Sequence, residues 1–253
     1  MSYQTLLTST PSAGVALIKL NRPRQYNALN TQLLTELADA LEHCERDDAI
    51  AVIVITGSEK AFAAGADIAE MLGKTGAEMR DVFIANPGWT AISHCKKPTI
   101  CAVAGLALGG GFELALQGDI LIAASNAKLG LPEVNLGVIP CAGGTQRITN
   151  LVGKSLAMEM VLNGRCLSAE EALDNGVVSR IVEPKKLEVE AITLAEQIAA
   201  RAPLAVRAGK RCVNKAVLST LEEGLAVEQE TFPALFDSKD AQQLMSAFLN
   251  KGK

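Results

Sequence analysis

Two short segments of this chain are apolar on both faces. Ala51–Thr56 (AVIVIT) is a run of mostly β-branched residues, and Pro98–Ala104 (PTICAVA) is almost as apolar. A strand with one solvent-facing side alternates apolar and polar residues, and these two runs do not. They therefore predict strands buried on both faces, which is typical of a parallel sheet covered by helices.

Strands and helices are expected to alternate around these two segments. The other expected elements are strands at Val15–Leu20 and Ile120–Ala124, helices at Asn30–Arg46 and from about Ile68, and a Gly-rich turn with a short helix in Leu108–Gly118. After an irregular stretch, Leu129–Thr145, the pattern is mostly helical. The order predicts an α/β core with a C-terminal helical region.

Several short signals mark where helices begin and end. Asn30 or Thr31 is a suitable N-cap for the first long helix. Capping boxes are predicted from Ser168 with Glu171 and from Ser219 with Glu222. Gly176 fits a C-cap, and Pro184 fits the first turn of a helix.

Composition and charge exclude several classes of protein. The 253 residues carry a net charge of −4, and the densest cationic cluster, Arg207, Lys210, Arg211 and Lys215, fits the solvated face of a helix. A nucleic-acid partner is therefore not expected. No apolar run reaches the ~18 residues of a membrane span, and no signal peptide is visible. The six cysteines are scattered without a CxxC pair, which indicates reduced thiols and a cytoplasmic location.

Common catalytic motifs are missing. With two histidines, His43 and His94, most His-based metal sites are disfavoured. There is no GxSxG sequence, Ile148 stands where a Walker A loop needs Gly, and Leu114 breaks the dinucleotide fingerprint that Gly109 could begin.

Two carboxylates stand alone in apolar sequence. Glu113 is the only charged residue from Pro98 to Gly118, and Glu133 is the only one from Leu129 to Gln146. Burial without a cation raises a carboxyl pKa and suits the group to acid–base work near neutral pH. The structural alternatives stay open at this point: Glu113 as a helix-start dipole partner, and Glu133 as a surface turn residue.

Two small-residue loops, each before an expected helix, are Gly109-Gly110-Gly111 and Ala63–Asp67. Unpaired N–H groups at helix starts can bind an anion, and the lack of side chains allows close approach. One N–H from each loop would form an oxyanion hole. The alternative is a pair of tight turns, with Asp67 as an N-cap.

Together these motifs resemble the enoyl-CoA hydratase/isomerase (crotonase) superfamily, and the enoyl-CoA hydratases within it most of all. The matching stretches, in the order of the family, are Asn21–Leu29 (NRPRQYNAL), Ala61–Asp67 (AFAAGAD), Ala104–Leu116 (AGLALGGGFELAL), Leu129–Arg147 (LGLPEVNLGVIPCAGGTQR) and Met245–Lys251 (MSAFLNK).

The resemblance implies a fold, an assembly and a substrate class. The fold would be a spiral of ββα units over residues 1–195, followed by a helical trimerisation region over residues 196–253. The assembly would be a homotrimer or a hexamer of two trimers. The substrate would be an acyl-CoA thioester, with no metal or redox cofactor.

The resemblance also assigns residues. The thioester oxygen would accept hydrogen bonds from Ala66 and Gly110. Residues expected to contact CoA are Arg24, Ala64, Asp67, Ile68, Phe248 and Lys251. Glu113 and Glu133 would hold one water and add it across the 2,3 double bond of a trans-2-enoyl-CoA, in fatty-acid or related β-oxidation.

Other activities compete with this hypothesis. A Δ3-Δ2-enoyl-CoA isomerase could work with Glu133 alone, and a hydratase could prefer a dicarboxylic or aromatic-pathway enoyl-CoA. A non-catalytic CoA-ester binder and an RNA-binding protein are less well supported, because both carboxylates are present and the net charge is negative.

Two residues depart from the pattern that the family commonly shows. Phe112 stands where a small residue or Cys is common and is expected to reshape the acyl end of the pocket. Cys141 stands where Gly is common and is interpreted as structural.

Overall fold

The computed structural model describes residues 3–250. Its larger sheet has the strand order β1-β2-β3-β5-β7-β10. The strands are β1 Leu6–Ser12, β2 Gly14–Leu20, β3 Ile50–Thr56, β5 Thr99–Val103, β7 Ile120–Ala124 and β10 Ile181–Val182. Within this sheet β1 and β2 form an antiparallel hairpin, and the other neighbouring pairs are parallel.

The central strands are buried on both faces, as their sequences predict. In β3, Ile53 and Ile55 join one hydrophobic cluster, while Val52 and Val54 join a second cluster on the opposite face. This division follows from the two-residue period of a strand. The second cluster is covered by α8 Leu187–Ala199, whose Leu187, Ala191 and Ala195 face the sheet.

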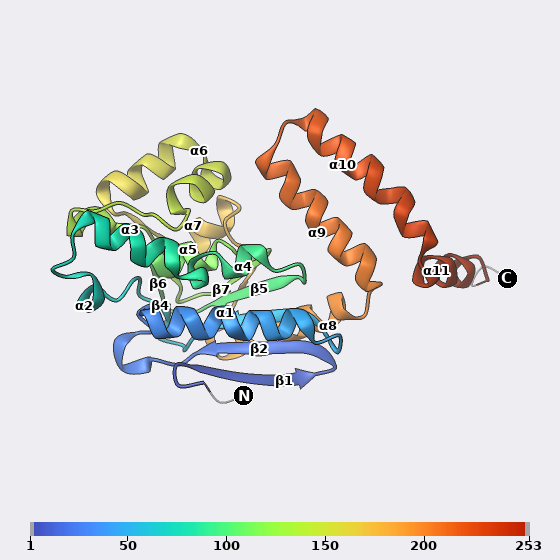
Figure 1. Cartoon of the computed structure of the whole chain (residues 1–253), viewed down its shortest axis with the longest axis horizontal. Helices are drawn as coiled ribbons and strands as arrows, with labels where there is room; N and C mark the ends of the chain where they lie inside the picture. The colour runs from blue at the N-terminus through green and yellow to red at the C-terminus, as the bar shows by residue number, and fades with distance from the viewer. Residues whose placement is uncertain (1–2, 251–253) are drawn as a thin grey trace.

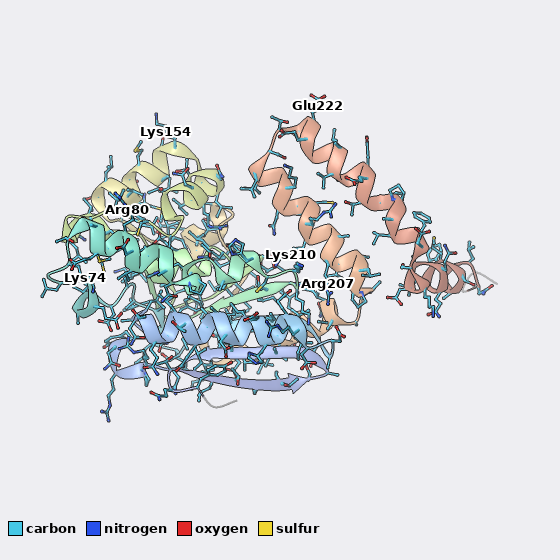
Figure 2. All side chains as sticks on the ribbon, viewed as in Figure 1. Lys74, Arg80, Lys154, Arg207, Lys210 and Glu222 are labelled. Carbon is cyan, nitrogen blue, oxygen red and sulfur yellow. The ribbon has the colours of Figure 1, made fainter. Side chains whose placement is uncertain are left out.

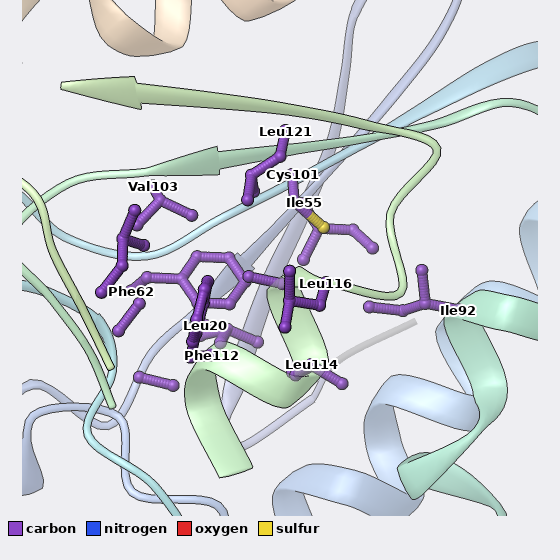
Figure 3. Close-up of a cluster of buried hydrophobic side chains, with 14 of the residues drawn as sticks. Leu20, Ile55, Phe62, Ile92, Cys101, Val103, Phe112, Leu114, Leu116 and Leu121 are labelled. Atoms are coloured by element: carbon purple, nitrogen blue, oxygen red, sulfur yellow. The ribbon is translucent and has the colours of Figure 1, made fainter. Parts of the chain in front are cut away.

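The first cluster joins residues of both sheets and of the helices packed on them. Figure 3 shows part of it, with Phe62 of β4 and Phe112 of α5 packed among side chains of the larger sheet. Phe112 is fully buried there and does not line the cavity described below. The expectation that Phe112 reshapes the acyl end of the pocket is therefore wrong, because its side chain points into the core.

A smaller sheet repeats the order of the larger one. It has the order β4-β6-β8-β9, with strands β4 Ala61–Ala63, β6 Leu106–Leu108, β8 Lys128–Gly130 and β9 Cys166–Ser168. The strands β3, β5 and β7 are each followed by one short strand of this sheet and then by helix. This repetition is the predicted spiral of ββα units, and the carboxyl ends of parallel β4, β6 and β8 meet at one edge.

Helices fill the connections and form the C-terminal region. The α-helices besides α8 are α1 Thr31–Arg46, α2 Ile68–Met71, α3 Gly76–Ala85, α4 Ala91–His94, α5 Gly110–Ala115, α6 Gly144–Asn163, α7 Ala169–Asp174, α9 Pro203–Leu218, α10 Leu221–Ala234 and α11 Lys239–Asn250. The 3-10 helices are η1 Pro23–Gln25, η2 Pro87–Trp89, η3 Pro132–Leu136, η4 Pro184–Lys186 and η5 Leu235–Asp237. None of the helices within residues 3–250 combines the length and apolar character of a membrane span.

Most of the predicted helix ends are confirmed. Asn30 caps α1, Ser168 and Glu171 form a capping box, and Gly176 follows α7 with a φ of 71°. The second predicted box is wrong by one residue: Thr220 and Glu223 form it. Ser219 cannot be the cap because it ends α9, where its hydroxyl donates to the carbonyl of Lys215.

The C-terminal helices extend away from the sheets (Figure 1). In α9, Lys210 pairs with Asp119 at 2.6 Å and donates to the carbonyl of Lys97. The interpretation of the basic cluster as a solvated face is therefore wrong for Lys210, which anchors α9 to the core. The predicted boundary between residues 195 and 196 falls within α8 and stays a prediction.

Candidate active site

Three loops meet beside a cavity of about 470 Å³. They follow β4, β6 and β8. The residues that they and the adjoining helix starts bring to the cavity wall are Ala64, Gly65, Ala66, Gly109, Gly110, Glu113, Pro132 and Glu133. The carboxyl ends of neighbouring parallel strands share one edge of a sheet, and open α/β sheets bind ligands there. The edge thus brings together both predicted carboxylates and both predicted amide donors.

Glu113 is the more firmly held carboxylate. It lies in the first turn of α5 and is only 2% exposed. Its Oε1 accepts hydrogen bonds from the backbone N–H groups of Ala142 and Gly144, each at 2.7 Å. Burial raises the pKa of Glu113, while these backbone donors act in the opposite direction. Glu113 also lines the cavity.

The loop before α6 is shaped around Glu113. A Cβ on Gly144 would lie 2.9 Å from both Cγ and Oε1 of Glu113. Only glycine therefore lets this backbone N–H approach the carboxylate so closely. Sequence reasoning missed Ala142 and Gly144 as partners of Glu113, although the AGGTQR motif contains both.

Glu133 occupies a different environment. It lies in η3, and its Oε2 is buried without a hydrogen-bond partner among the described residues. Burial raises the pKa of Glu133 to about 7, and the nearby charge of Glu113 adds to the rise. A carboxyl with this pKa carries a proton about half the time at neutral pH.

Gly109 precedes α5 and lies against the carboxyl group of Glu133. It has φ 51° and ψ −130°, and a Cβ there would lie 3.0 Å from Oε1 of Glu133. Both its conformation and its contact with Glu133 require the absence of a side chain. Gly109 therefore sets the position of the Glu133 carboxyl.

Two backbone N–H groups adjoin the carboxylates. Gly110 is the first residue of α5, so its N–H has no acceptor within the helix. Leu29 forms a parallel bridge with Ala66 through hydrogen bonds to Gly65 and Asp67, which leaves the N–H of Ala66 on the other side of the chain. A Cβ on Gly110 would lie 3.4 Å from the nitrogen of Ala66, so the two groups are neighbours.

An aromatic pair packs beside these amides. The ring of Trp89 would be 3.0 Å from a Cβ on Gly110, and it stacks on Phe83 with centroids 4.7 Å apart and an interplanar angle of 8°. Both residues line the cavity, together with apolar side chains such as Met79 and Ile139. No spacing in the sequence indicated this wall, because its residues come from separate segments.

Asp67 has two structural partners. Its carboxylate caps α2 by accepting from Ala69 and pairs with Arg22 at 2.9 Å. Arg22 also donates to the carbonyl of Ala28. The N-cap alternative for Asp67 is thus observed, and the residue does not line the cavity.

The other residues expected to contact CoA fall into three groups. Ala64 and Ile68 line the cavity. Arg24 is exposed in η1 and does not line it. Phe248 is 78% exposed on α11, far from the cavity in this chain, and Lys251 lies outside the described residues.

Cys141 is exposed and lines the cavity near both carboxylates, whose charges raise the pKa of its thiol beyond the effect of burial. A raised pKa disfavours the reactive thiolate, and the interpretation of Cys141 as structural stays a prediction. Within residues 3–250, no three His, Cys, Asp or Glu side chains converge in a way that could hold a metal ion.

Comparisons with known proteins identify the family of this chain. The model of the family described as enoyl-CoA hydratase/isomerase matches residues 10–253. A probable enoyl-CoA hydratase of Rhizobium meliloti is 48% identical over 100% of this chain and 98% of its own length. The mitochondrial enoyl-CoA hydratase of Pongo abelii is 45% identical over 94% of this chain and 82% of its own length.

Solved structures show the same similarity. An enoyl-CoA hydratase subunit from Geobacillus kaustophilus superposes with a TM-score of 0.93 and 44% identity, covering 98% of this chain and 96% of its own. The enoyl-CoA hydratase from Bacillus anthracis gives a TM-score of 0.93 at 38% identity, and the match covers 98% of this chain and 97% of the other. The chain belongs to the enoyl-CoA hydratase/isomerase family.

Proposed function

We propose that this protein is an enoyl-CoA hydratase. It adds water across the 2,3 double bond of a trans-2-enoyl-CoA and gives a 3-hydroxyacyl-CoA, in fatty-acid or related acyl-CoA β-oxidation. The observation that carries the proposal is the pair of unlike carboxyls, Glu113 and Glu133, beside two neighbouring backbone N–H groups. The names of the relatives support the same activity.

The backbone N–H groups of Ala66 and Gly110 would polarise the thioester. Both donate to the thioester oxygen, which gains negative charge as C3 is attacked. Fixed donors aimed at a developing charge contribute about 3–4 kcal/mol each to the reduction of the barrier. The Trp89 and Phe83 rings keep water away from this side and strengthen the interaction.

The two carboxyls divide the proton transfers. Glu113, held through Oε1, is the ionised partner and takes a proton from water as the oxygen adds to C3. Glu133, whose pKa of about 7 keeps it partly protonated, gives its proton to C2. One proton then passes from Glu113 to Glu133, so the pair returns to its starting state and no proton is gained or lost.

Binding of the CoA part is proposed for the residues assigned from the resemblance. Ala64 would offer its carbonyl to the adenine amino group, and Ile68 would pack against the ligand. Arg24 would face the phosphates. Asp67 would act by holding its loop through Arg22, and Phe248 and Lys251 would reach the CoA of a neighbouring subunit.

The proposal extends to assembly, cofactors and location. We propose a homotrimer or a hexamer built through α9–α11, with the acyl-CoA thioester as the sole small-molecule partner and no separate cofactor. The cytoplasmic location expected from the sequence is part of the same proposal.

Isomerisation is the second candidate activity, since it can use Glu133 alone. The backbone donors that fix Glu113 favour hydration, because isomerisation has no need of a second positioned base.

The test is to incubate the protein with crotonyl-CoA and follow the loss of enoyl-thioester ultraviolet absorbance. A trans-3-enoyl-CoA is supplied in parallel as the isomerase substrate. We expect rapid hydration and much slower isomerisation. Isomerisation without hydration would refute the proposal in favour of the isomerase.

A further inference from the structure

One cation lines the cavity and has no part in the proposed chemistry. Among the residues of 3–250 that line the cavity, Arg80 is the only one with a positive charge. It lies on α3, whose residues Gly76, Met79, Arg80 and Phe83 all line the cavity. Their spacing of three, four and seven residues places them on one face of the helix. Arg80 therefore belongs to the face of α3 that forms the cavity wall. Figure 2 labels its side chain.

Arg80 is not neutralised by the catalytic carboxylates. It is exposed and forms no salt bridge with any residue between 3 and 250. Its guanidinium thus stands apart from the two carboxyls, with its donors available to an anion.

The surfaces between Arg80 and the amide donors are apolar. Trp89 packs against Gly110, and Phe83 stacks on Trp89. Arg80 precedes Phe83 by three residues, a rise of about 4.5 Å along α3. Met79 lies beside it on the same wall. A ligand that extends from the amides along this wall meets an apolar stretch first and a cation afterwards.

We infer that Arg80 selects acyl chains that end in a carboxylate. This inference rests on the proposed hydratase function and names its substrate class: enoyl-CoA esters of dicarboxylic acids. The thioester lies at Ala66 and Gly110, the methylene groups lie along Phe83 and Met79, and the distal carboxylate pairs with Arg80. A guanidinium suits this pairing because it donates two parallel hydrogen bonds to a carboxylate.

The experiment compares two six-carbon substrates, trans-2-hexenedioyl-CoA and trans-2-hexenoyl-CoA, which differ only in the distal carboxylate. The proteins are the unmodified enzyme, Arg80→Ala, Arg80→Lys and Lys74→Ala. Lys74 is a matched control, since it is an exposed cation six residues away that does not line the cavity.

We expect Arg80→Ala to lower kcat/KM for the diacid ester by roughly 10- to 100-fold and to change the neutral ester little. Arg80→Lys should show a smaller loss, because Lys keeps the charge without the planar fork. Lys74→Ala should leave both substrates unaffected. An equal loss on both substrates would assign Arg80 to the CoA phosphates and overturn the inference, as would no loss on either.

Binding of the saturated esters adipoyl-CoA and hexanoyl-CoA, measured by calorimetry, separates this inference from the proposed function. Because these esters have no double bond, they are not turned over. We expect Arg80→Ala to weaken the binding of adipoyl-CoA and to change the binding of hexanoyl-CoA little. If the unmodified enzyme hydrates neither unsaturated ester, the proposed function fails. The affinity for adipoyl-CoA relative to hexanoyl-CoA, compared between the unmodified enzyme and Arg80→Ala, still tests the role of Arg80. Equal effects of Arg80→Ala on the two saturated esters would contradict the inference.

Discussion

The two glutamates differ in the surroundings of their carboxyl groups. Glu113 is buried but accepts two backbone hydrogen bonds at one oxygen. Glu133 has a buried oxygen without a partner among the described residues and a pKa of about 7. Two carboxyl groups in such different surroundings can act as a base and as an acid at the same pH. The ionised base and the protonated acid of the proposed reaction follow from this difference.

The rate of hydration should depend on the protonation of Glu133. Because its pKa is raised to about 7, Glu133 is protonated below that pH and ionised above it. We expect kcat/KM for crotonyl-CoA to be lost as pH rises through about 7, approaching tenfold per unit. The pH profile of initial rates measures this. A profile that stays flat to pH 9 would contradict Glu133 as the acid.

The sequence predicted Glu113 and Glu133 as candidate catalytic residues, but it did not predict most of the residues around them. Glu113 and Glu133 stood out because each is a lone charge in apolar sequence. Trp89 and Arg80 gave no comparable signal, since their role depends on where α3 and η2 pack against the sheet edge. The partners of Asp67 were foreseen only in part: the N-cap was considered, and the ion pair with Arg22 was not.

Glycines at two strand-to-helix junctions are needed for the site to form. Gly109 turns the chain from β6 into α5 and leaves room for the Glu133 carboxyl. Gly144 starts α6 and brings its N–H to Glu113. The strand-to-helix junctions are therefore part of the catalytic geometry.

Adding a methyl group at Gly109 should displace Glu133. In Gly109→Ala, the Cβ would lie 3.0 Å from Oε1, in a backbone conformation that disfavours side chains. We expect kcat to fall by at least about 10²-fold, with a loss of about 1–3 kcal/mol of stability. Kinetics and thermal unfolding measure the two effects.

Gly76→Ala is the matched control for Gly109→Ala. Gly76 lines the same cavity, but a Cβ there meets no atom within 4 Å and its φ is not positive. The control should keep near-full activity and stability. If Gly109→Ala behaved like Gly76→Ala, the contact between Gly109 and Glu133 would have no catalytic importance.

The long elements were predictable, and the short ones were not. Apart from one threonine each, the strands β3 and β5 are apolar, so their sequences indicate their burial. The strands β4, β6 and β8 have three residues each, too few for a period of two to show. The helix expected from Ile68 is divided into α2 and α3, because Gly73 adopts a φ of 83° between them.

The C-terminal helices leave much apolar surface uncovered in the single chain. On α9, Val213 and Val217 are exposed one turn apart, and Leu221 and Phe232 are exposed on α10. An apolar surface of this extent is typical of a subunit interface. The arrangement fits the trimer or hexamer that we propose.

Light scattering after size-exclusion chromatography tests the assembly. We expect a mass of three or six chains for the unmodified protein. Val217→Asp places a charge in the proposed interface and should shift the mass towards one chain. Glu222→Gln, an exposed change on α10, should leave the mass unchanged. A single-chain mass for the unmodified protein would contradict the proposed assembly.

A double-mutant cycle tests whether Glu113 and Glu133 act together on one water. The hydration rate of crotonyl-CoA is measured for Glu113→Gln, Glu133→Gln and the double variant, with binding of a saturated acyl-CoA as a check on folding. We expect each single variant to lose roughly 10²–10⁴-fold in kcat. The double variant should lose little more than the worse single variant, and binding should be retained. Near-full activity in either single variant, or losses that multiply, would contradict the claim.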